Sequence, residues 1–276
     1  MNWKNWTLIH RLVAGAVFAY ALLLYLLTVA PTASFWDSGE FIAIANRLQV
    51  SHPPGAPFYM LIGRFFSMFV PTAYIALSIN LVSVVASALT VLLTHLIIVR
   101  LVQEWQGRPA SWTPQQHITA LFGGAIGALT FAATDSFWFN AVEAEVYAMS
   151  MLFTAAVVWL IMRWSEQAEH EEAMLKGGQH PFGLSANRYL VLIAYLFGLA
   201  IGVHLLNLLA IFFIALIVFF TEFDRPEWTS GKRWLGIAAA GVVSMVIFIA
   251  IYPGVVQWLP GLIGIAPFLV LFLLIG

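Results

Sequence analysis

The chain has 276 residues, of which 62% are hydrophobic, 15% aromatic and only 9% charged, with a formal net charge of −1. So few charges exclude a soluble globular domain. A net charge close to zero gives no excess of basic residues with which to bind a nucleic acid. The absence of cysteine excludes disulfides and thiolate chemistry. The composition therefore predicts an all-α polytopic membrane protein.

Eight apolar segments have the composition of membrane spans, each of which needs roughly 20 residues to cross a bilayer core of about 30 Å. In chain order they are residues 11–30, 73–99, 118–134, 147–164, 189–203, 205–220, 234–252 and 260–276. Together they predict a single transmembrane domain, residues 1–276, built as a helix bundle. The first span lacks a small-residue cleavage site and is expected to be a retained signal anchor. Because the chain stops within an apolar run, we expect that a C-terminal part is missing.

The basic residues predict the orientation in the membrane. If the N-terminus is cytoplasmic, ten of the twelve Lys and Arg residues lie inside, and only Arg47 and Arg64 lie outside. This is the positive-inside pattern. It requires two short helices in 189–220, which turn near His204. The predicted external loops are 31–72 and 135–146, and the predicted cytoplasmic loops are 100–117, 165–188 and 221–233.

The first external loop is too polar to be a full span. Residues 36–49 have the pattern of a short amphipathic helix, with Phe41, Ile44 and Leu48 on one stripe. The segment Ser51-His-Pro-Pro-Gly-Ala-Pro57 breaks this helix. Residues 58–70 have the composition of a second helix that lies on the membrane surface. Two short interfacial helices are therefore expected.

The external loops contain five carboxylates, beginning with Asp37 and Glu40 directly after the first span. Their i, i+3 spacing places both on one face of a helix. One of them can act as a base while the other orients it or raises its pKa by repulsion. Alternatively, Glu40 only supports the first helical turn. The other three acids are Asp135, Glu143 and Glu145.

Glu143 and Glu145 allow two interpretations. On a helix their side chains point apart, and Glu143 shares a face with Tyr147. On an extended loop they face together and can hold a divalent metal through oxygen ligands. The sequence requires no other cofactor. Aromatic residues beside these acids are also typical of the membrane interface.

Positive partners for a phosphate are scarce on the external side. A lipid-phosphate leaving group needs such a partner, and Arg47 and Arg64 are the two fixed external cations. Snorkelling toward lipid headgroups is the alternative role for each. His52, in the His-Pro-Pro-Gly turn, and His204, at the turn of the helical hairpin, are further candidates to donate to a phosphate or a sugar.

Three long segments also carry a resemblance to a family. They are APTASFWDSGEFIAIANRLQVSHPPGAPFYMLIGRFFSMF, FWFNAVEAEVYAMSMLFTA and GLAIGVHLLNLLAI. In this order they resemble the N-terminal membrane region of a multi-pass family that was long a domain of unknown function. That family is now grouped with the protein O-mannosyltransferases of the GT-C glycosyltransferase superfamily. Many GT-C enzymes carry adjacent acids in the first external loop, whereas the spacing here is Asp-x-x-Glu.

The resemblance implies a function. It implies a polyprenyl- or dolichyl-phosphate sugar as donor, a Ser or Thr of an exported protein as acceptor, and Asp37 as the catalytic base, with Glu40 close by. The expected enzyme lies in the cytoplasmic (inner) membrane among lipids, with its site facing the periplasm or lumen, and inverts the sugar. Family members are longer, so this chain is expected to hold the donor and base site and to lack the acceptor-binding region.

Two other classes of protein remain open. A transporter or lipid flippase would place ionisable groups near the bilayer midplane and often has repeated halves. Here the acids lie at the ends of spans and no repeat is visible, which favours the enzyme. A non-catalytic membrane subunit is the third possibility.

Overall fold

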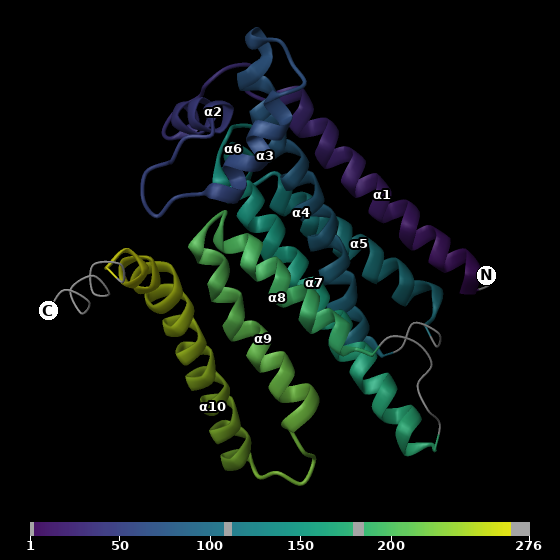
Figure 1. Cartoon of the computed structure of the whole chain (residues 1–276). Coiled ribbons are helices and arrows are strands. Elements are labelled where there is room, and N and C mark those ends of the chain that lie inside the picture. Colours follow the sequence, from purple (N-terminus) through teal and green to yellow (C-terminus); the bar gives the residue numbers. More distant parts are fainter. Residues whose placement is uncertain (1–2, 108–111, 179–184, 266–276) are drawn as a thin grey trace, which may run out of the picture. The chain divides into compact units, whose positions relative to one another are not determined.

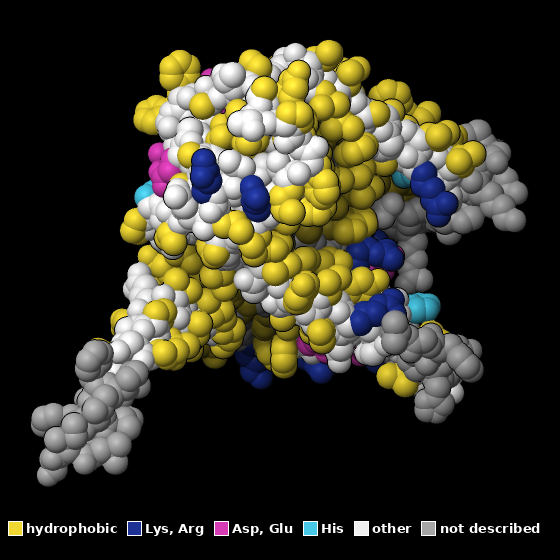
Figure 2. Space-filling model, turned by 45° about the horizontal axis from the view of Figure 1, so that its top comes forward, with side chains coloured by type: hydrophobic (Ala, Val, Ile, Leu, Met, Phe, Trp, Pro, Cys, Tyr) yellow, Lys and Arg dark blue, Asp and Glu magenta, His cyan; other side chains and the backbone are white. Residues whose placement is uncertain are grey.

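The computed structural model describes residues 3–107, 112–178 and 185–265, and all regular structure within these ranges is helical (Figure 1). Within these ranges, five helices are long and apolar enough to cross a membrane, or six if the bent pair Pro114–Ala132 and Asp135–Ala141 counts as one span. The prediction of an all-α polytopic membrane protein is confirmed. Figure 2 shows hydrophobic side chains over much of the visible surface, with charged side chains only in patches. Such a surface suits contact with lipid tails.

The described residues form two compact units. The first contains residues 1–160 and 190–207, and the second contains residues 161–189 and 208–276. The long helices of the first unit are α1 (Trp3–Thr28), α4 (Ile75–Gln106), α5 (Pro114–Ala132), most of α8 (Asn187–Ile201) and the first half of α7 (Val146–Lys176). Its shorter elements are α2 (Ser38–Arg47), α3 (Pro57–Ser67), η1 (Thr72–Tyr74) and α6 (Asp135–Ala141).

The second unit contains the second half of α7 and the part of the chain that follows the start of the short 3-10 helix η3 (Leu205–Leu209). It contains α9 (Ala210–Val218), the π-helix η4 (Phe219–Phe223), α10 (Ser230–Ile249) and the π-helix η5 (Ala250–Trp258). Helical structure runs unbroken from Ser230 to Ile265, where the sequence predicted two spans with a gap at 253–259. Most of the predicted span 260–276 lies outside the described residues, so the count of about eight spans and the single domain stay predictions.

Three helices of the first unit, α1, α4 and α5, pack side by side through small residues (Figure 1). Ala21, Ala88 and Ala128 are fully buried in one cluster, and small side chains let helix backbones approach closely. A Cβ added at Gly124 would lie 2.7 Å from Cγ2 of Val99. The Tyr25 hydroxyl donates to the Ala132 carbonyl at 2.9 Å, which ties the C-terminal ends of α1 and α5 together.

Two short helices lie between α1 and α4, in the segment predicted to be the first external loop, but with tighter bounds than predicted. α2 begins at Ser38 and ends at Arg47. Phe41 and Ile44 are buried, whereas Leu48 is 53% exposed and has a left-handed backbone as the C-cap. The prediction that Leu48 joins the buried stripe is therefore wrong, because the helix ends before it. α2 and α3 pack closely: a Cβ on Gly63 would lie 2.8 Å from the Cβ of Ala45.

Two predicted cytoplasmic loops are partly helical. α4 continues to Gln106 and α7 continues to Lys176, well past the apolar segments. Both extensions carry polar pairs at helical spacing, including Arg100 with Glu104 and Glu172 with Lys176. Because such i, i+4 pairs stabilise a helix without any burial, hydropathy alone places the ends of these helices too early.

Candidate functional site

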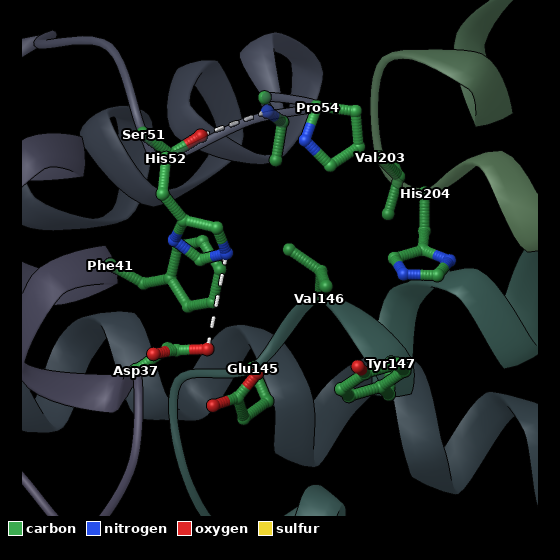
Figure 3. Close-up of a pocket in the computed structure, with 12 residues that line it drawn as sticks. Asp37, Phe41, Ser51, His52, Pro54, Glu145, Val146, Tyr147, Val203 and His204 are labelled. Carbon is green, nitrogen blue, oxygen red and sulfur yellow. Dashed lines mark hydrogen bonds and ion pairs between the residues drawn. The ribbon is translucent and has the colours of Figure 1, made fainter.

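One pocket of the first unit brings together residues from three separate parts of the chain (Figure 3). It has a volume of about 60 Å³. The start of α2 and the 51–56 turn form one side, the segment before α7 forms the second, and the turn after α8 forms the third. Its polar lining residues are Asp37, Ser51, His52, Glu145, Tyr147 and His204.

Asp37 lies at the N-terminus of α2. It is the N-cap residue, and its carbonyl accepts a hydrogen bond from the Phe41 amide at 2.9 Å. The preceding Trp36 has a φ of 56°, which turns the chain sharply from the end of α1 into α2. The carboxylate makes no capping hydrogen bond, and its side chain is 56% exposed. Asp37 is therefore free to meet a ligand from outside.

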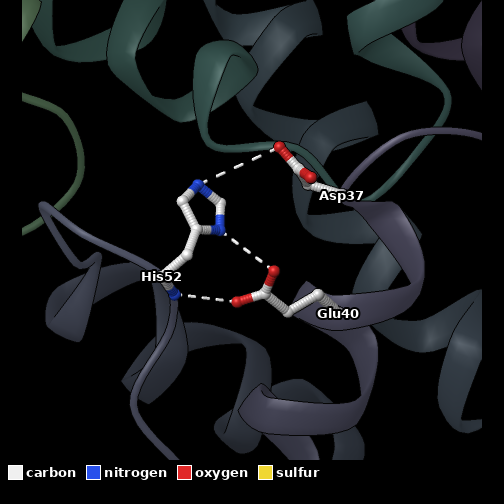
Figure 4. Close-up of side chains that lie close together, drawn as sticks. All are labelled: Asp37, Glu40 and His52. Carbon is white, nitrogen blue, oxygen red and sulfur yellow. Dashed lines mark hydrogen bonds and ion pairs between the residues drawn. The ribbon is translucent and has the colours of Figure 1, made fainter.

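His52 is held by Glu40 through two hydrogen bonds (Figure 4). The His52 amide donates to Oε1 of Glu40 at 2.8 Å, and Nδ1 of the imidazole lies 3.0 Å from Oε2. The second ring nitrogen, Nε2, lies 4.0 Å from Oδ2 of Asp37. These contacts lower the pKa of Glu40, because both hydrogen bonds favour its charged form, and the bond to Glu40 raises the pKa of His52.

The turn that carries His52 is closed by its own polar groups. The Ser51 hydroxyl accepts from the Ala56 amide at 3.1 Å, and the His52 carbonyl accepts from the Gly55 amide at 2.9 Å. Gly55 has a φ of 88°, a conformation that glycine adopts without steric cost. The His-Pro-Pro-Gly segment therefore fixes where His52 lies relative to α2.

Glu143 and Glu145 lie in a non-helical segment between α6 and α7 and are 2% and 4% exposed. Glu145 lines the pocket, whereas Glu143 does not. Burial, with the nearby charges of Glu143 and Asp37, raises the pKa of Glu145 to about 7. Burial also raises the pKa of Glu143. The predicted helical face shared by Glu143 and Tyr147 is wrong, because α7 begins at Val146.

Tyr147 and His204 form the third side of the pocket. Their ring centroids are 5.1 Å apart. Burial lowers the pKa of His204, whose Nδ1 accepts a hydrogen bond from the Leu206 amide at 3.2 Å. Burial therefore favours the neutral form of His204. It lies in the turn after α8, at the place where the sequence predicted the hairpin to reverse.

Arg47 and Arg64 lie apart from this pocket. They line a second groove of about 490 Å³, together with Asn46, Leu48, Thr72 and Ile75. Nη1 of Arg64 donates to the Asn46 carbonyl at 2.7 Å and to its Oδ1 at 3.1 Å. Arg47 ends α2, whereas Asp37 caps its start, so about 15 Å of helix separates their backbones at 1.5 Å per residue.

Sequence reasoning did not single out Asn207, which supports the turn beside the pocket. Its side-chain nitrogen donates to the carbonyl of His204 at 2.9 Å, and its oxygen accepts from Ser150 at 3.0 Å and Thr154 at 2.9 Å. Asn207 is 3% exposed. The sequence contained one signal for this role: Asn207 is a single amide within an apolar run, and a buried amide needs hydrogen-bond partners.

Comparison with known proteins identifies a family for the part of the chain that contains these residues. The family model described as "Protein O-mannosyl-transferase TMEM260 N-terminal domain" matches residues 37–227, which include every residue that lines the pocket. "Protein O-mannosyl-transferase tmem260" of Dictyostelium discoideum is 25% identical over 146 residues, which are 52% of this chain and 16% of that protein. "Protein O-mannosyl-transferase TMEM260" of Mus musculus is 28% identical over 157 residues, which are 57% of this chain and 20% of that protein.

The aligned region thus spans a fifth or less of these curated relatives. No solved structure matches the chain. The family model, by contrast, covers well over half of the chain and begins at Asp37 itself. The chain belongs to the family of the protein O-mannosyl-transferase TMEM260 N-terminal domain.

Proposed function

We propose that this chain forms the membrane part of a glycosyltransferase that moves a mannose-like sugar from a polyprenyl-phosphate donor to a Ser or Thr of an exported protein. The family and the names of the relatives support a protein O-mannosyltransferase. The observation that carries the chemistry is Asp37, an exposed carboxylate that lines a polar pocket in the segment after the membrane-length helix α1. A base placed there meets a lipid-borne donor and a water-borne acceptor.

Asp37 acts as the general base in this proposal. Its carboxylate takes the proton of the acceptor hydroxyl while the oxygen attacks the anomeric carbon. The new carbon–oxygen bond forms on one face of the sugar as the bond to the phosphate oxygen breaks on the other, and the anomeric centre inverts. The phosphate leaves with the bonding electrons and already ionised, so one base and electrostatic stabilisation suffice.

Arg47 and Arg64 hold the donor phosphate. Both arginines line the groove, and none of its lining residues is acidic. The bonds from Nη1 of Arg64 to Asn46 leave its Nε and Nη2 as donors for a phosphate. Since inversion needs the base and the leaving group on opposite faces of one sugar ring, the proposal requires the arginine side chains to reach from the groove toward a phosphate whose anomeric carbon lies beside Asp37.

The remaining polar residues are assigned by position. His52 lies next to Asp37 and is held by Glu40, so we assign it to positioning the base rather than to the phosphate. Tyr147, His204 and Glu145 line the pocket and provide hydrogen-bonding groups for sugar hydroxyls. The positive-inside pattern of the sequence supports a site that faces away from the cytoplasm.

The test is sugar transfer from a radiolabelled polyprenyl-phosphate donor by the membrane-embedded protein, with Asp37→Asn as the variant. An amide keeps the shape but cannot accept a proton, so we expect turnover to fall by about 10²–10⁴-fold with little change in donor binding. The matched control is Asp135→Asn, an exposed acid that lines neither pocket. Normal sugar transfer by Asp37→Asn would show that Asp37 is not the general base. Movement of the lipid across vesicles without transfer would favour a flippase.

A further inference from the structure

A hydrogen-bond network centred on Asn207 joins α7 to the turn after α8. The Asn207 Oδ1 accepts from the hydroxyls of Ser150 at 3.0 Å and Thr154 at 2.9 Å, both on α7. Its Nδ2 donates to the carbonyls of Ala200 at 3.2 Å and His204 at 2.9 Å. Asn207 is 3% exposed, and these four bonds use both donor hydrogens and both acceptor positions of its amide. The amide therefore fixes the turn against one face of α7.

The pocket lies one turn of α7 away from this network. Tyr147 precedes Ser150 by three residues, so both lie on the same face of the helix. The rings of Tyr147 and His204 have centroids 5.1 Å apart and line the pocket together. Figure 3 shows both on the side of the pocket opposite His52. The network thus sets where His204 lies relative to Tyr147.

The contacts of the His204 imidazole decide which of its nitrogens carries the proton. Nδ1 accepts a hydrogen bond from the Leu206 amide at 3.2 Å, so its lone pair is used and it carries no proton. In the neutral ring, which burial favours, the proton then lies on Nε2. Within the described residues Nε2 makes no hydrogen bond of its own. The pocket is therefore lined by one N–H donor on a ring whose tautomer is fixed.

We propose that the Nε2–H of His204 donates a hydrogen bond to one hydroxyl of the donor sugar and selects for that hydroxyl, with Asn207 as the residue that positions it. This inference deepens the proposed sugar transfer and rests on it. A neutral N–H suits a hydroxyl oxygen, which accepts through its lone pairs. A site built to bond a particular hydroxyl rejects the analogue that lacks it, because the group that binds the hydroxyl is left unpaired.

The test is sugar transfer from a polyprenyl-phosphate mannose donor by the membrane-embedded protein, with His204→Gln and His204→Asn as a matched pair. The amide nitrogen of glutamine can take the place of Nε2, whereas that of asparagine takes the place of Nδ1. We expect His204→Ala to raise the donor KM by about 3–10-fold, the usual effect of one neutral hydrogen bond, with little change in kcat. His204→Gln should keep a KM close to the native value, and His204→Asn should resemble His204→Ala.

Monodeoxy forms of the same donor identify the hydroxyl. One of them should be a poor substrate for the native protein, because it cannot accept the bond from Nε2. His204→Ala should transfer that deoxy sugar as well as it transfers the complete sugar, since the variant has no donor left to satisfy.

Asn207→Ala tests the positioning role through a double-mutant cycle. Alone it should raise the donor KM about as much as His204→Ala does. Combined with His204→Ala it should add less than about twofold, because Asn207 acts through the ring. Thr154→Val removes one bond of the network and should give a partial loss. Its matched control is Thr90→Val, a buried threonine of α4 whose hydroxyl donates to the Ala86 carbonyl of its own helix, and this variant should keep the native KM.

The melting temperature of each variant shows that it is folded. Additive effects of folded Asn207→Ala and His204→Ala would overturn the positioning role. A native KM in His204→Ala, or equal use of every monodeoxy donor by the native protein, would overturn the contact with the sugar. A native protein that transfers no sugar would contradict the proposed function instead. Affinity for the donor lipid in the same variants would then decide the contact: equal affinity in the native protein and His204→Ala would overturn it, and a loss restored by His204→Gln would support it.

Discussion

His52 shows how one residue can link the two acids of the first external loop. Glu40 does not contact Asp37 directly in the hydrogen bonds of the described residues, but both reach His52. Glu40 therefore acts on the base through the imidazole. The i, i+3 spacing of Asp37 and Glu40 predicted that the two acids share a helical face. The structure adds that the His52 imidazole lies between them.

Glu40→Ala should reveal this positioning role. Without the carboxylate, His52 loses both hydrogen bonds, and the imidazole beside Asp37 is no longer held. We expect kcat for sugar transfer to fall by about 10-fold while the donor KM changes little, since an interaction that matters only in the transition state affects kcat. Glu40→Gln should recover part of the loss, because the amide oxygen still accepts one of the two bonds. A change in KM alone would place Glu40 in donor binding instead.

The two arginines should respond differently to lysine. Within the described residues Arg47 makes no hydrogen bond or ion pair, whereas Arg64 holds Asn46. Arg47→Lys keeps the charge but loses the planar fork, so donor affinity should fall with an unchanged melting temperature. Arg64→Lys should lower both donor affinity and stability. Binding of a lipid-phosphate analogue and thermal unfolding measure the two effects, and unchanged affinity in both variants would exclude this groove as the phosphate site.

At the scale of elements, the pocket depends on close packing between α3 and the turn after α8. The Phe58 amide donates to the Gly202 carbonyl at 2.7 Å, and a Cβ on residue 202 would lie 2.9 Å from the Cβ of Phe58. This contact positions the turn that carries His204. A side chain larger than hydrogen at residue 202 would push that turn away from α3.

Gly202→Ala and Gly198→Ala form a matched pair that tests this contact. Gly198 lies in α8 with no atom within 4 Å of an added Cβ. Its replacement should be neutral or stabilise the helix by up to about 1 kcal/mol. Gly202→Ala should destabilise the protein by about 1–3 kcal/mol through overpacking. The comparison is made by thermal unfolding in detergent, and equal melting temperatures would show that α3 and the turn are not in tight contact.

At the scale of the whole molecule, the orientation rests on the ten basic residues that the positive-inside pattern places in the cytoplasm. The absence of cysteine makes labelling free of background. Asp135→Cys and Leu206→Cys, both at exposed positions, should react with an impermeant thiol reagent in intact cells. Glu104→Cys should react only after permeabilisation. Labelling of Leu206→Cys only after permeabilisation would refute the hairpin and reverse the orientation that follows it.

The sequence alone determined the class of the fold, the family and the segment that carries the acids. A long apolar run can satisfy its backbone in a bilayer only as a helix, so composition sufficed for the all-α membrane fold. The sequence also predicted the break between α2 and α3, because Pro53, Pro54 and Gly55 disfavour a continuous helix. Both features depend on residues that are neighbours in the chain, and a sequence shows such neighbours directly.

Only the tertiary structure decided which polar residues share a pocket. Glu145 and His204 are far from Asp37 in the chain, and they reach its pocket because α7 begins, and α8 ends, beside the start of α2. The structure also separated Arg47 from Asp37, although both belong to one short helix. Residue spacing could not predict this, because contacts between distant segments depend on how small residues such as Gly63 and Gly202 let the elements approach.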